Sequence, residues 1–475
     1  MLVPEIGTEC KGEHMKRFQR SRVISTLLAL TLVGSMGAFT AVATGGAAAA
    51  AATTKFGTLA SPCGHGKATG ATDQGVTNTS IKIAYGDDRG YSGVPGLDQE
   101  MGNAVKAFIS WCNNQGGING RKVVGDYYDA AVLQANTVMT QACKTDFMLV
   151  GEGFALDQSA EQTRLGCNLV QVPGFAVGSD VANAYESYQP TPNPVNMSPV
   201  SAAYQVKGLF PSKVLKTGQY SENLSPVEVS MAKAKQAYQQ TGWKYVNCPF
   251  EINYTGEPDY TPFAQKLQSC GAQVVYTDVS PSPELYGVLQ ADNQLGYNPI
   301  WVGDTNLYSP QFAKWNTSGL ANNFYVRSAY APLNAANVVP AVKQYLNIVK
   351  STGPTNQLGE QAASAFLLWA TEAKACGSTL TRQCMVNNLA KVTAWTGGGL
   401  SAPGDVAKNT PPQCGVLLRL QNTKYVQVVP KKLGTYQCSS KFVVPNTGVA
   451  ILGTTLNADG KSTKYVTPST IKPQS

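Results

Sequence analysis

Apolar and polar residues alternate in a run that begins at Ser80, and a second apolar run ends at Asp129. The stretch between them repeats apolar residues at the i, i+3, i+4, i+7 and i+11 spacing of one helical face: Met101, Ala104, Val105, Phe108 and Cys112. Gly116 and Gly117 follow, and glycine readily takes the left-handed conformation that ends many helices. The order strand, helix, strand predicts a right-handed crossover and a parallel sheet.

The alternation of strands and helices continues in one series up to residue 173 and starts again at residue 213. The second series predicts strands at 213–217, 244–249, 272–277 and 299–303, with helices at 226–240, 260–270 and 283–295. Later, long amphipathic helices are predicted at 338–351 and 360–376, a shorter helix at 384–392 and a hairpin at 415–420 and 424–429. This order predicts an α/β fold with two doubly wound parallel-sheet lobes joined by hinge crossings.

Three segments fit the crossings between these lobes. Residues 181–204 contain four prolines and alternate poorly, the chain crosses back after Tyr325, and the glycines at 397–399 fit a third crossing. The predicted organisation is an upstream segment and signal peptide (1–43), a disordered lead-in (44–74), lobe 1 (75–198 plus 326–400), lobe 2 (199–325 plus 401–440) and a C-terminal tail (441–475).

The N-terminus has the pattern of an export signal. Met15 begins a basic stretch, residues 23–42 are apolar, and Ala41 and Ala43 form a small-x-small cleavage site. We therefore expect translation to start at Met15, cleavage near Ala43, and an extracellular or cell-envelope location. An uncleaved anchor is the alternative, because the apolar stretch approaches the ~20 residues that span a bilayer.

Composition excludes several classes of function. The chain has 475 residues, more than one core of ordinary size accommodates, and its net charge of +8 is spread without a basic cluster. A nucleic-acid or anionic-membrane role would need such a cluster. The two histidines, His14 and His65, precede both predicted lobes, so Ser-His-Asp catalysis and His-ligated zinc are excluded in the lobes. We expect no cofactor and no metal site.

The cysteines favour structural disulfides. Eleven cysteines become ten once Cys10 is set aside with the upstream segment, and no C-x-x-C pair of a redox or metal site is present. The sequence does not give the connectivity. Pairing neighbours along the chain would join Cys63 with Cys112, Cys143 with Cys167, Cys248 with Cys270, Cys376 with Cys384, and Cys414 with Cys438.

Two segments resemble a known family. GVTNTSIKIAYG at 75–86 and WCNNQGGINGRKV at 111–123, followed by Asp129, resemble the extracytoplasmic solute-binding proteins of the branched-chain amino acid ABC transporter type. The resemblance covers roughly residues 75–438 and implies a type I periplasmic-binding fold whose two lobes close on a small ligand. Members from Gram-positive bacteria are often lipoproteins with a small residue before the acylated cysteine. Here Pro62 precedes Cys63, which argues against a lipid anchor.

The ligand site is expected at the loops that follow the strands. In open parallel sheets ligands lie beyond the carboxyl ends of the strands, and both lobes then face one cleft. This rule selects residues 87–92, 152–156, 174–177, 219–222, 278–280 and 304–306. The predicted ligand-binding residues are Tyr91, Ser92, Phe154, Ala155, Phe175, Ala176, Tyr220, Asp278, Asp304 and Asn306.

The resemblance implies more specific roles. Members that bind amino acids hold the carboxylate with hydroxyls and backbone amides of the loops matching 153–155 and 174–176, and the ammonium with an acid matching Asp304. Phe154 and Phe175 stand where Ser or Thr is expected, which favours a more apolar or aromatic ligand. Each residue also has a structural explanation. Asp304 and Asp278 could cap helices, the phenylalanines could belong to the core, and Tyr91 and Ser92 could form a plain turn.

These features predict a non-enzymatic receptor that captures a small amino-acid-like or amphipathic ligand between its lobes and delivers it to ABC permease subunits. It would meet the membrane only through a partner or an anchor. The first alternative is a ligand-sensing subunit that signals to a membrane partner. The second is an exported carboxylate-based hydrolase, which would need Asp87 or Asp88 to converge with Asp304.

Overall fold

The computed structural model of this chain describes residues 55–248, 251–448, 453–465 and 471–474. The predicted upstream segment, signal peptide and cleavage site at residues 1–43 lie outside the described residues. Within residues 55–474, two separate sheets organise the chain. We call each sheet with the helices that pack on it a lobe, the first lobe built on the sheet that contains β3 and the second on the sheet that contains β8.

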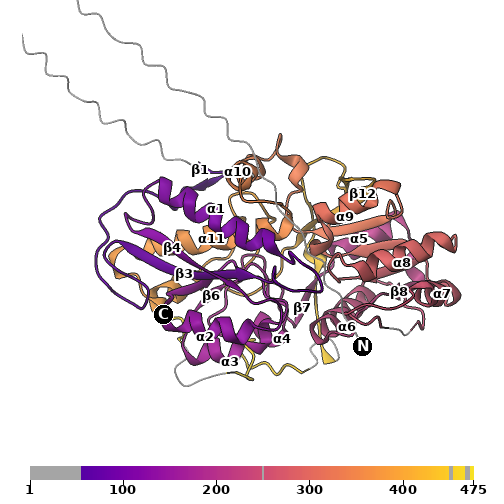
Figure 1. Cartoon of the computed structure of the whole chain (residues 1–475), viewed down its shortest axis with the longest axis horizontal. Coiled ribbons are helices and arrows are strands. Elements are labelled where there is room, and N and C mark those ends of the chain that lie inside the picture. The colour runs from indigo at the N-terminus through magenta and orange to yellow at the C-terminus, as the bar shows by residue number, and fades with distance from the viewer. Residues whose placement is uncertain (1–54, 249–250, 449–452, 466–470, 475) are drawn as a thin grey trace, which may run out of the picture. The chain divides into compact units, whose positions relative to one another are not determined.

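The first sheet is parallel throughout, with the order β4-β3-β5-β6. Its strands are β3 (Ser80–Asp87), β4 (Lys122–Asp129), β5 (Met148–Val150) and β6 (Gln171–Val172). Helices α1 (Gln99–Asn114) and α11 (Gln357–Cys376) cover one face, and α2 (Ala135–Thr145) and α3 (Glu161–Gly166) cover the other (Figure 1). Because side chains alternate along β3, Ile81 and Ile83 join the core under α1 and α11, while Ala84 joins the core under α2.

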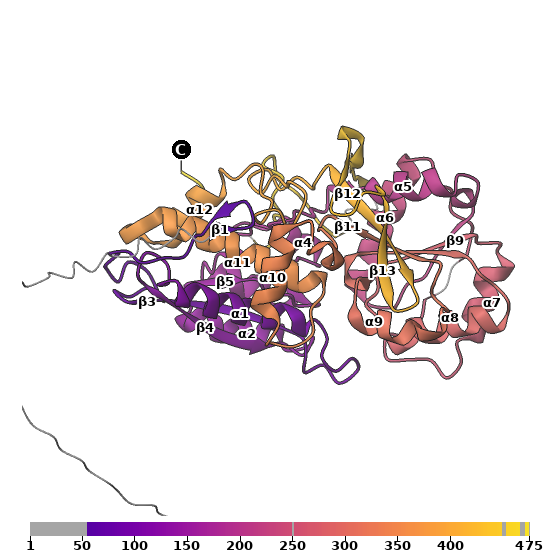
Figure 2. The ribbon, with the colours of Figure 1, turned by 90° about the horizontal axis from the view of Figure 1, so that it is seen from above.

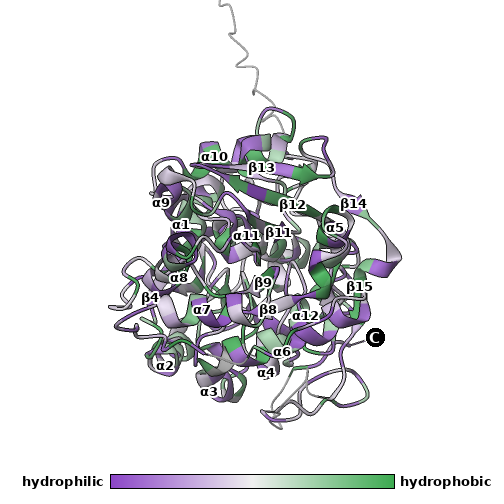
Figure 3. Cartoon of the chain, turned by 90° about the vertical axis from the view of Figure 1, so that its right-hand side faces the viewer, coloured by the Kyte–Doolittle hydropathy of each residue, from purple (hydrophilic) through white to green (hydrophobic). Residues whose placement is uncertain are grey.

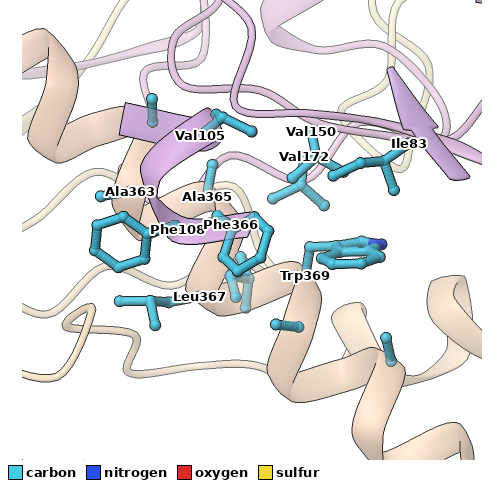
Figure 4. Close-up of a cluster of buried hydrophobic side chains, with 14 of the residues drawn as sticks. Ile83, Val105, Phe108, Val150, Val172, Ala363, Ala365, Phe366, Leu367 and Trp369 are labelled. Carbon is cyan, nitrogen blue, oxygen red and sulfur yellow. The ribbon is translucent and has the colours of Figure 1, made fainter. Parts of the chain in front are cut away.

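The core of the first lobe lies where α1 meets α11. The rings of Phe108 and Phe366 are 6.0 Å apart between centroids, and Trp369 lies 5.5 Å from Phe366. Figure 4 shows these rings beside Val150 and Val172 of the sheet. All five side chains are fully buried, so truncating either phenylalanine to alanine would cost about 3–5 kcal/mol.

The second sheet has the order β13-β12-β11-β10-β9-β8, with β14 paired to β12. Its strands are β8 (Thr217–Gln219), β9 (Val274–Thr277), β10 (Ile300–Gly303), β11 (Phe324–Ser328), β12 (Cys414–Gln421), β13 (Lys424–Val429) and β14 (Gln437–Cys438). Strands β8 to β11 are parallel, and β12 with β13 forms the predicted antiparallel hairpin.

Helices cover both faces of this sheet as well. Helices α7 (Thr261–Ser269), α8 (Pro283–Gln294) and α9 (Pro310–Trp315) lie on one face, and α5 (Ser201–Leu209) and α6 (Ser225–Gln240) lie on the other (Figure 2). Val275 packs toward the first group, whereas its neighbours Val274 and Tyr276 pack toward the second. Apolar colour runs along β11 and β12, and the helices carry both colours (Figure 3), as two-sided covering requires. The predicted doubly wound α/β fold is confirmed.

Local sequence signals start several of these helices. Ser282 caps α8 by accepting a hydrogen bond from the Leu285 amide at 3.2 Å, and Pro283 takes the first helical position, where its missing N–H costs nothing. Asn356 caps α11 in the same way through the Gly359 amide at 3.1 Å. The capping residues therefore fix where these helices begin relative to the strand ends.

The chain passes between the two sheets three times, as predicted: between β6 and α5, after β11, and before β12. Helices α10 (Pro340–Val349), α11 and α12 (Arg382–Leu389) lie between the second and third passages and pack in the first lobe. The first passage contains α4 (Ser179–Ala182) and β7 (Met197–Pro199). Short 3-10 helices complete the chain at Asp157–Ser159, Lys213–Leu215, Thr305–Leu307 (η3), Asn316–Ser318, Leu333–Ala335, Gly377–Thr379 and Ser440–Phe442.

The prediction of a disordered lead-in is wrong for residues 55–74. Strands β1 (Lys55–Phe56) and β2 (Leu59–Ala60) form a short antiparallel pair. Phe56 is fully buried, with its ring 5.5 Å from that of Phe108 and 6.0 Å from that of Trp111. One aromatic anchor and the Cys63–Cys112 disulfide therefore order a segment whose small, polar composition indicated disorder.

Three further boundaries differ from the prediction. Residues 213–215 form a 3-10 helix, β8 begins at Thr217, and within the predicted strand 244–249 the described residues pair with β8 only through an isolated Thr217–Tyr245 bridge. Strand β11 keeps residues 326–328 in the second sheet rather than in lobe 1. The predicted tail contains β15 (Val443–Pro445), which pairs with β7.

Among the described residues five disulfides form, and each joins cysteines that are neighbours along the chain. They are Cys63–Cys112, Cys143–Cys167, Cys248–Cys270, Cys376–Cys384 and Cys414–Cys438. Closing a loop removes conformations from the unfolded chain, and the gain grows with loop length. The 49-residue separation of Cys63 and Cys112 is the longest of the five, so in that model this bond contributes most.

Candidate functional site

The carboxyl ends of the first sheet bring the predicted loops of the first lobe to one edge. Strand β3 ends at Asp87, β5 at Val150 and β6 at Val172, and because all are parallel the loops that follow them are neighbours. The amides of these loops already bind one another: Gly174 N donates to Glu152 O at 2.9 Å and Gly153 N to Gly86 O at 3.3 Å.

Asp87 and Asp88 are both bound by other groups of the chain. Asp87 accepts hydrogen bonds from Arg89 Nε at 2.9 Å and from the Tyr127 hydroxyl at 2.7 Å. Asp88 Oδ1 accepts from the Val132 amide, and Asp88 Oδ2 accepts from the Ala155 amide, each at 2.6 Å. Burial raises the pKa of Asp88 to about 6, although these two amides oppose the shift.

Asp157, which the strand-end rule did not select, also binds backbone amides of a neighbouring loop. Its two oxygens accept from the amides of Val177 and Gly178, each at 2.8 Å. Burial raises its pKa to about 7, against the effect of these amides. The only sequence signal was an aspartate soon after a strand, without any indication that its partners lie 20 residues further on.

The predicted aromatic and alanine residues of these loops are mostly core residues. Phe154 is 3% exposed and packs with Met139 and Leu149 in the core under α2. Ala176 is buried in a small cluster with two residues of α4. Phe175 is half-buried and lines, with Phe154, a cavity of about 10 Å³, the size of one water molecule.

Glu152 also lines this small cavity. Its side chain is 4% exposed, and Oε2 has no hydrogen-bond partner among the described residues. Burial raises the pKa of Glu152 well above its usual value. A larger cavity of about 360 Å³ is lined by Trp111, Gln344 and Ile348, but no predicted ligand residue lines it.

The loop after β3 lies near acidic residues of the second lobe. Tyr91 is partly exposed and Ser92 is exposed. Burial raises the pKa of Tyr91, and the nearby Tyr254, Glu284 and Glu222 raise it further. Tyr91 is thus the predicted ligand residue of the first lobe that lies near acidic groups of the second.

In the second lobe, Tyr220 belongs to the core. It is fully buried, and its ring packs edge-on against Trp301 at 5.9 Å. Glu222 follows it in the loop after β8, and burial together with Glu284 raises the pKa of Glu222 to about 8. Glu222 lies in the loop 219–222 that the strand-end rule selected, but neither Glu222 nor Glu284 was predicted to bind the ligand.

Asp304 caps the short helix η3, which was the structural alternative for this residue. It accepts a hydrogen bond from the Thr305 amide at 2.5 Å and forms an ion pair with Arg327. Register explains this pair: Gly303 of β10 pairs with Val326 of β11, so the next residues along both strands are neighbours. The protein itself neutralises the charge of Asp304.

Asp278 and Asn306 lie side by side after β9 and β10. The Asn306 amide nitrogen donates to the carbonyl oxygen of Asp278 at 2.8 Å. Among the described residues, neither Asp278 Oδ1 nor Asn306 Oδ1 has a hydrogen-bond partner. Burial raises the pKa of Asp278 to about 7, Asp304 raises it further, and Ser230 and Arg327 oppose the shift.

Lys233 of α6 is bound to the first passage between the sheets. Its ammonium donates to Asn193 Oδ1 at 2.8 Å and to Pro194 O at 2.6 Å. Burial lowers the pKa of Lys233 to about 7. This lysine, like Arg327, was missed because its partners are distant in sequence.

The arrangement does not favour acid–base hydrolysis. Asp87, Asp88 and Asp304 are each held by an arginine or by backbone amides, whereas a hydrolase needs two carboxyl groups converging on a substrate. Within the described ranges, no group of three or more His, Cys, Asp or Glu side chains could hold a metal ion. In the same part of the chain, no helix has the length and apolarity required to cross a bilayer.

One family model matches part of the chain, less than half of its length. Residues 220–424 match the family model described as periplasmic binding protein, a family of non-enzymatic solute-binding proteins. The motifs at 75–86 and 111–123 lie outside the matched segment. No curated protein matches the chain significantly.

Solved structures extend the similarity to both lobes. A fatty acid ABC transporter substrate-binding protein from Thermomonospora curvata is 17% identical, with a TM-score of 0.63 over 79% of this chain and 97% of its own. A branched-chain amino acid transporter substrate-binding protein from Streptococcus pneumoniae, in complex with isoleucine, is 16% identical, with a TM-score of 0.59 over 78% of this chain and 100% of its own.

A third similar structure is an ABC transporter solute-binding protein from R. palustris in complex with 4-hydroxybenzoate. It is 16% identical, with a TM-score of 0.57 over 73% of this chain and 95% of its own. At these identities the structures establish the fold rather than the ligand. The chain has the α/β fold of the type I periplasmic binding proteins.

Proposed function

We propose that this chain is an extracytoplasmic solute-binding protein that captures a small amphipathic ligand between its lobes and delivers it to an ABC permease. The observation that carries the proposal is the pair of parallel sheets joined by three passages of one chain. In this arrangement the lobes can rotate about the passages and close on a ligand. The match of residues 220–424 to periplasmic binding proteins supports the same function.

The proposed site combines the loops after β3, β5 and β6 with the loops after β8, β9 and β10. Among the predicted residues, six have side chains that are neither fully buried in a core nor neutralised by an ion pair: Tyr91, Ser92, Ala155, Phe175, Asp278 and Asn306. Tyr91 would cover the ligand from the first lobe, and Asp278 with Asn306 would accept its hydrogen bonds in the second.

Export is part of the proposal. Five disulfides fit an oxidising compartment outside the cytoplasm, and the basic and apolar stretches before Ala43 have the pattern of a signal peptide. Transport rather than sensing is favoured because the similar solved structures include ABC transporter binding proteins.

The test is ligand-dependent stabilisation followed by uptake. The exported protein is heated with amino acids, amides, amines, short-chain acids and aromatic metabolites, and a ligand at 100 times its Kd should add about 2.7 kcal/mol. We expect a saturable rise in Tm with one chemical class, and loss of uptake of that class in cells lacking the gene. A bound ligand whose uptake is unchanged would favour the sensing alternative, and silence across the panel would overturn solute binding.

A further inference from the structure

We infer that the ligand is an organic amine with an apolar body and without a carboxylate. This inference rests on the proposed function and specifies its ligand. It follows from the hydrogen-bonding groups that the strand-end loops leave unpaired. The chain itself occupies several of the donors that a carboxylate would use, while several acceptors that an amine would use lack partners among the described residues.

Three amides of the first-lobe loops, those of Ala155, Val177 and Gly178, are occupied by the protein's own carboxyl groups. Asp88 binds the Ala155 amide at 2.6 Å, and Asp157 binds the Val177 and Gly178 amides at 2.8 Å. Charged acceptors make the stronger hydrogen bonds to backbone amides. A ligand carboxylate would have to displace these side chains and would also meet their charge.

The cations at the strand ends are occupied too. Arg89 binds Asp87, and Arg327 binds Asp304. Lys233 donates to Asn193 and Pro194 of the first passage. A ligand carboxylate would therefore have to break an existing ion pair in order to find a cationic partner at these loops.

Apart from the Tyr220 hydroxyl, the unpaired side-chain atoms at the described residues of these loops are acceptors. Within the described ranges, Asp278 Oδ1, Asn306 Oδ1 and Glu152 Oε2 lack a partner, and the Glu152 side chain is 96% buried, at 4% exposure. A buried polar atom left unpaired destabilises the protein. An ammonium group offers three donors, and the hydrogen bond from the Asn306 side chain to the Asp278 carbonyl oxygen holds these two residues side by side.

The surroundings favour a positive ligand over a neutral one. Glu222, Glu284 and Tyr254 of the second lobe lie near Tyr91 of the first lobe. A nearby ammonium group favours the charged form of such carboxyl groups, and aromatic faces attract it as well. In contrast, the similar proteins solved with isoleucine and with 4-hydroxybenzoate each hold a ligand that contains a carboxylate group.

The experiment uses ligands that share a skeleton and differ in one polar group. Phenethylamine, phenylacetamide and phenylacetate form one set, and isoamylamine, isovaleramide and isovalerate form another. Affinities of the exported protein are measured by isothermal titration calorimetry at pH 7. We expect each amine to bind at least tenfold more tightly than its acid, with the amide between them.

Variants connect this preference to the unpaired acceptors. Asp278→Asn and, separately, Asn306→Ala are expected to weaken amine binding about tenfold or more. Asp292→Asn is the matched control, because Asp292 is a buried carboxyl of the same lobe whose partner is the Trp301 indole at 3.1 Å, away from the loops. It should leave amine affinity unchanged. The fold of each variant is checked by circular dichroism.

The outcomes separate this inference from the proposed function. If an acid binds more tightly than its amine, the protein is still a solute-binding protein and the amine inference is wrong. Equal amine affinity in wild type, Asp278→Asn and Asn306→Ala would also overturn it. If no member of either set binds while another class of the wider panel does, the amine inference is wrong and solute binding stands; silence across that whole panel overturns both.

Discussion

The strand-end loops of the two lobes differ in how the side-chain oxygens of four residues are hydrogen-bonded. In the first lobe, Asp88 and Asp157 each bind two backbone groups of neighbouring loops, so the edge is held together before any ligand arrives. In the second lobe, Asp278 and Asn306 each keep an oxygen that has no partner in the described part of the chain. Under the proposed function, this difference makes the first edge a rigid frame and the second edge the one that would recognise the ligand.

The arginine ion pairs repeat this contrast. Glu161 and Arg164 in the first lobe are 2% and 0% exposed, and Arg164 also donates to the carbonyl groups of Leu169 and Tyr185. In the second lobe, Asp304 and Arg327 are 21% and 18% exposed. A fully buried pair holds loops in place, whereas a partly exposed pair remains accessible to solvent and ligand.

The largest expected effect is on the buried pair. Arg164→Met leaves Glu161 buried without its cation and should lower the stability by about 3–5 kcal/mol. Arg327→Met is the matched variant in the second lobe and should cost only about 1 kcal/mol, because its pair is partly hydrated. Urea unfolding followed by circular dichroism measures both. Equal losses in the two variants would contradict the contrast between the lobes.

The next effect concerns Asp292, which also has an oxygen without a partner in the described residues but lies away from the strand-end loops. We expect this carboxyl group to affect stability and not ligand binding. Burial raises the pKa of Asp292 to about 8, against the hydrogen bond from the Trp301 indole. Since the folded pKa lies above the unfolded value near 3.8, stability is fully present below about pH 4 and is lost as pH rises toward 8. This one group contributes a slope of about −1.4 kcal/mol per pH unit in that window.

Asp292→Asn keeps an acceptor for the indole and removes the titration. The variant should therefore lose less stability than the wild type between pH 5 and pH 7, by about 3 kcal/mol. Thermal unfolding at the two pH values measures the difference. Identical pH dependence of wild type and variant would show that Asp292 ionises freely in the folded protein.

The fold could largely be predicted from the sequence, because its signals are local. Apolar periodicity predicted the helix now seen as α1 (Gln99–Asn114) and the hairpin of β12 and β13. Short or weakly apolar segments were harder: β8 has three residues, and the residues near Phe56 owe their order to contacts with α1. The order of this segment depends on a single buried ring and one disulfide, which hardly alter its composition, so composition alone indicated disorder.

The site was less predictable, because its partners come from different strands. Whether Asp304 is a free acid or half of an ion pair depends on the register of β10 against β11, which brings Arg327 beside it. Asp157 likewise meets Val177 and Gly178 only because β5 and β6 are adjacent. The rule that ligands lie beyond strand ends found the loops but not which oxygens the fold leaves unpaired.

A smaller effect is expected at Asp157 in the frame of the first lobe. Asp157→Ala removes the acceptor of the Val177 and Gly178 amides and should cost about 2 kcal/mol of stability. Asp157→Asn, which keeps one acceptor oxygen, should recover about half of that loss. Urea midpoints at pH 7 measure both variants. A loss below about 0.5 kcal/mol for the alanine variant would mean that these amides find other partners.

The smallest effect on stability is expected at Asp278. There the substitution should reduce the loss of stability as pH rises, whereas Asp157→Ala should destabilise the protein. Its pKa is raised to about 7 by burial, so stability is lost as pH rises through 7, and at pH 8 the folded protein carries a buried carboxylate whose Oδ1 has no partner in the described residues. Asp278→Asn removes that charge, so between pH 6 and pH 7 the variant should lose less stability than the wild type, by about 1 kcal/mol. Melting curves at the two pH values measure this. If the variant is instead destabilised as strongly as Asp157→Ala, Asp278 belongs to the frame, and the second lobe resembles the first rather than differing from it.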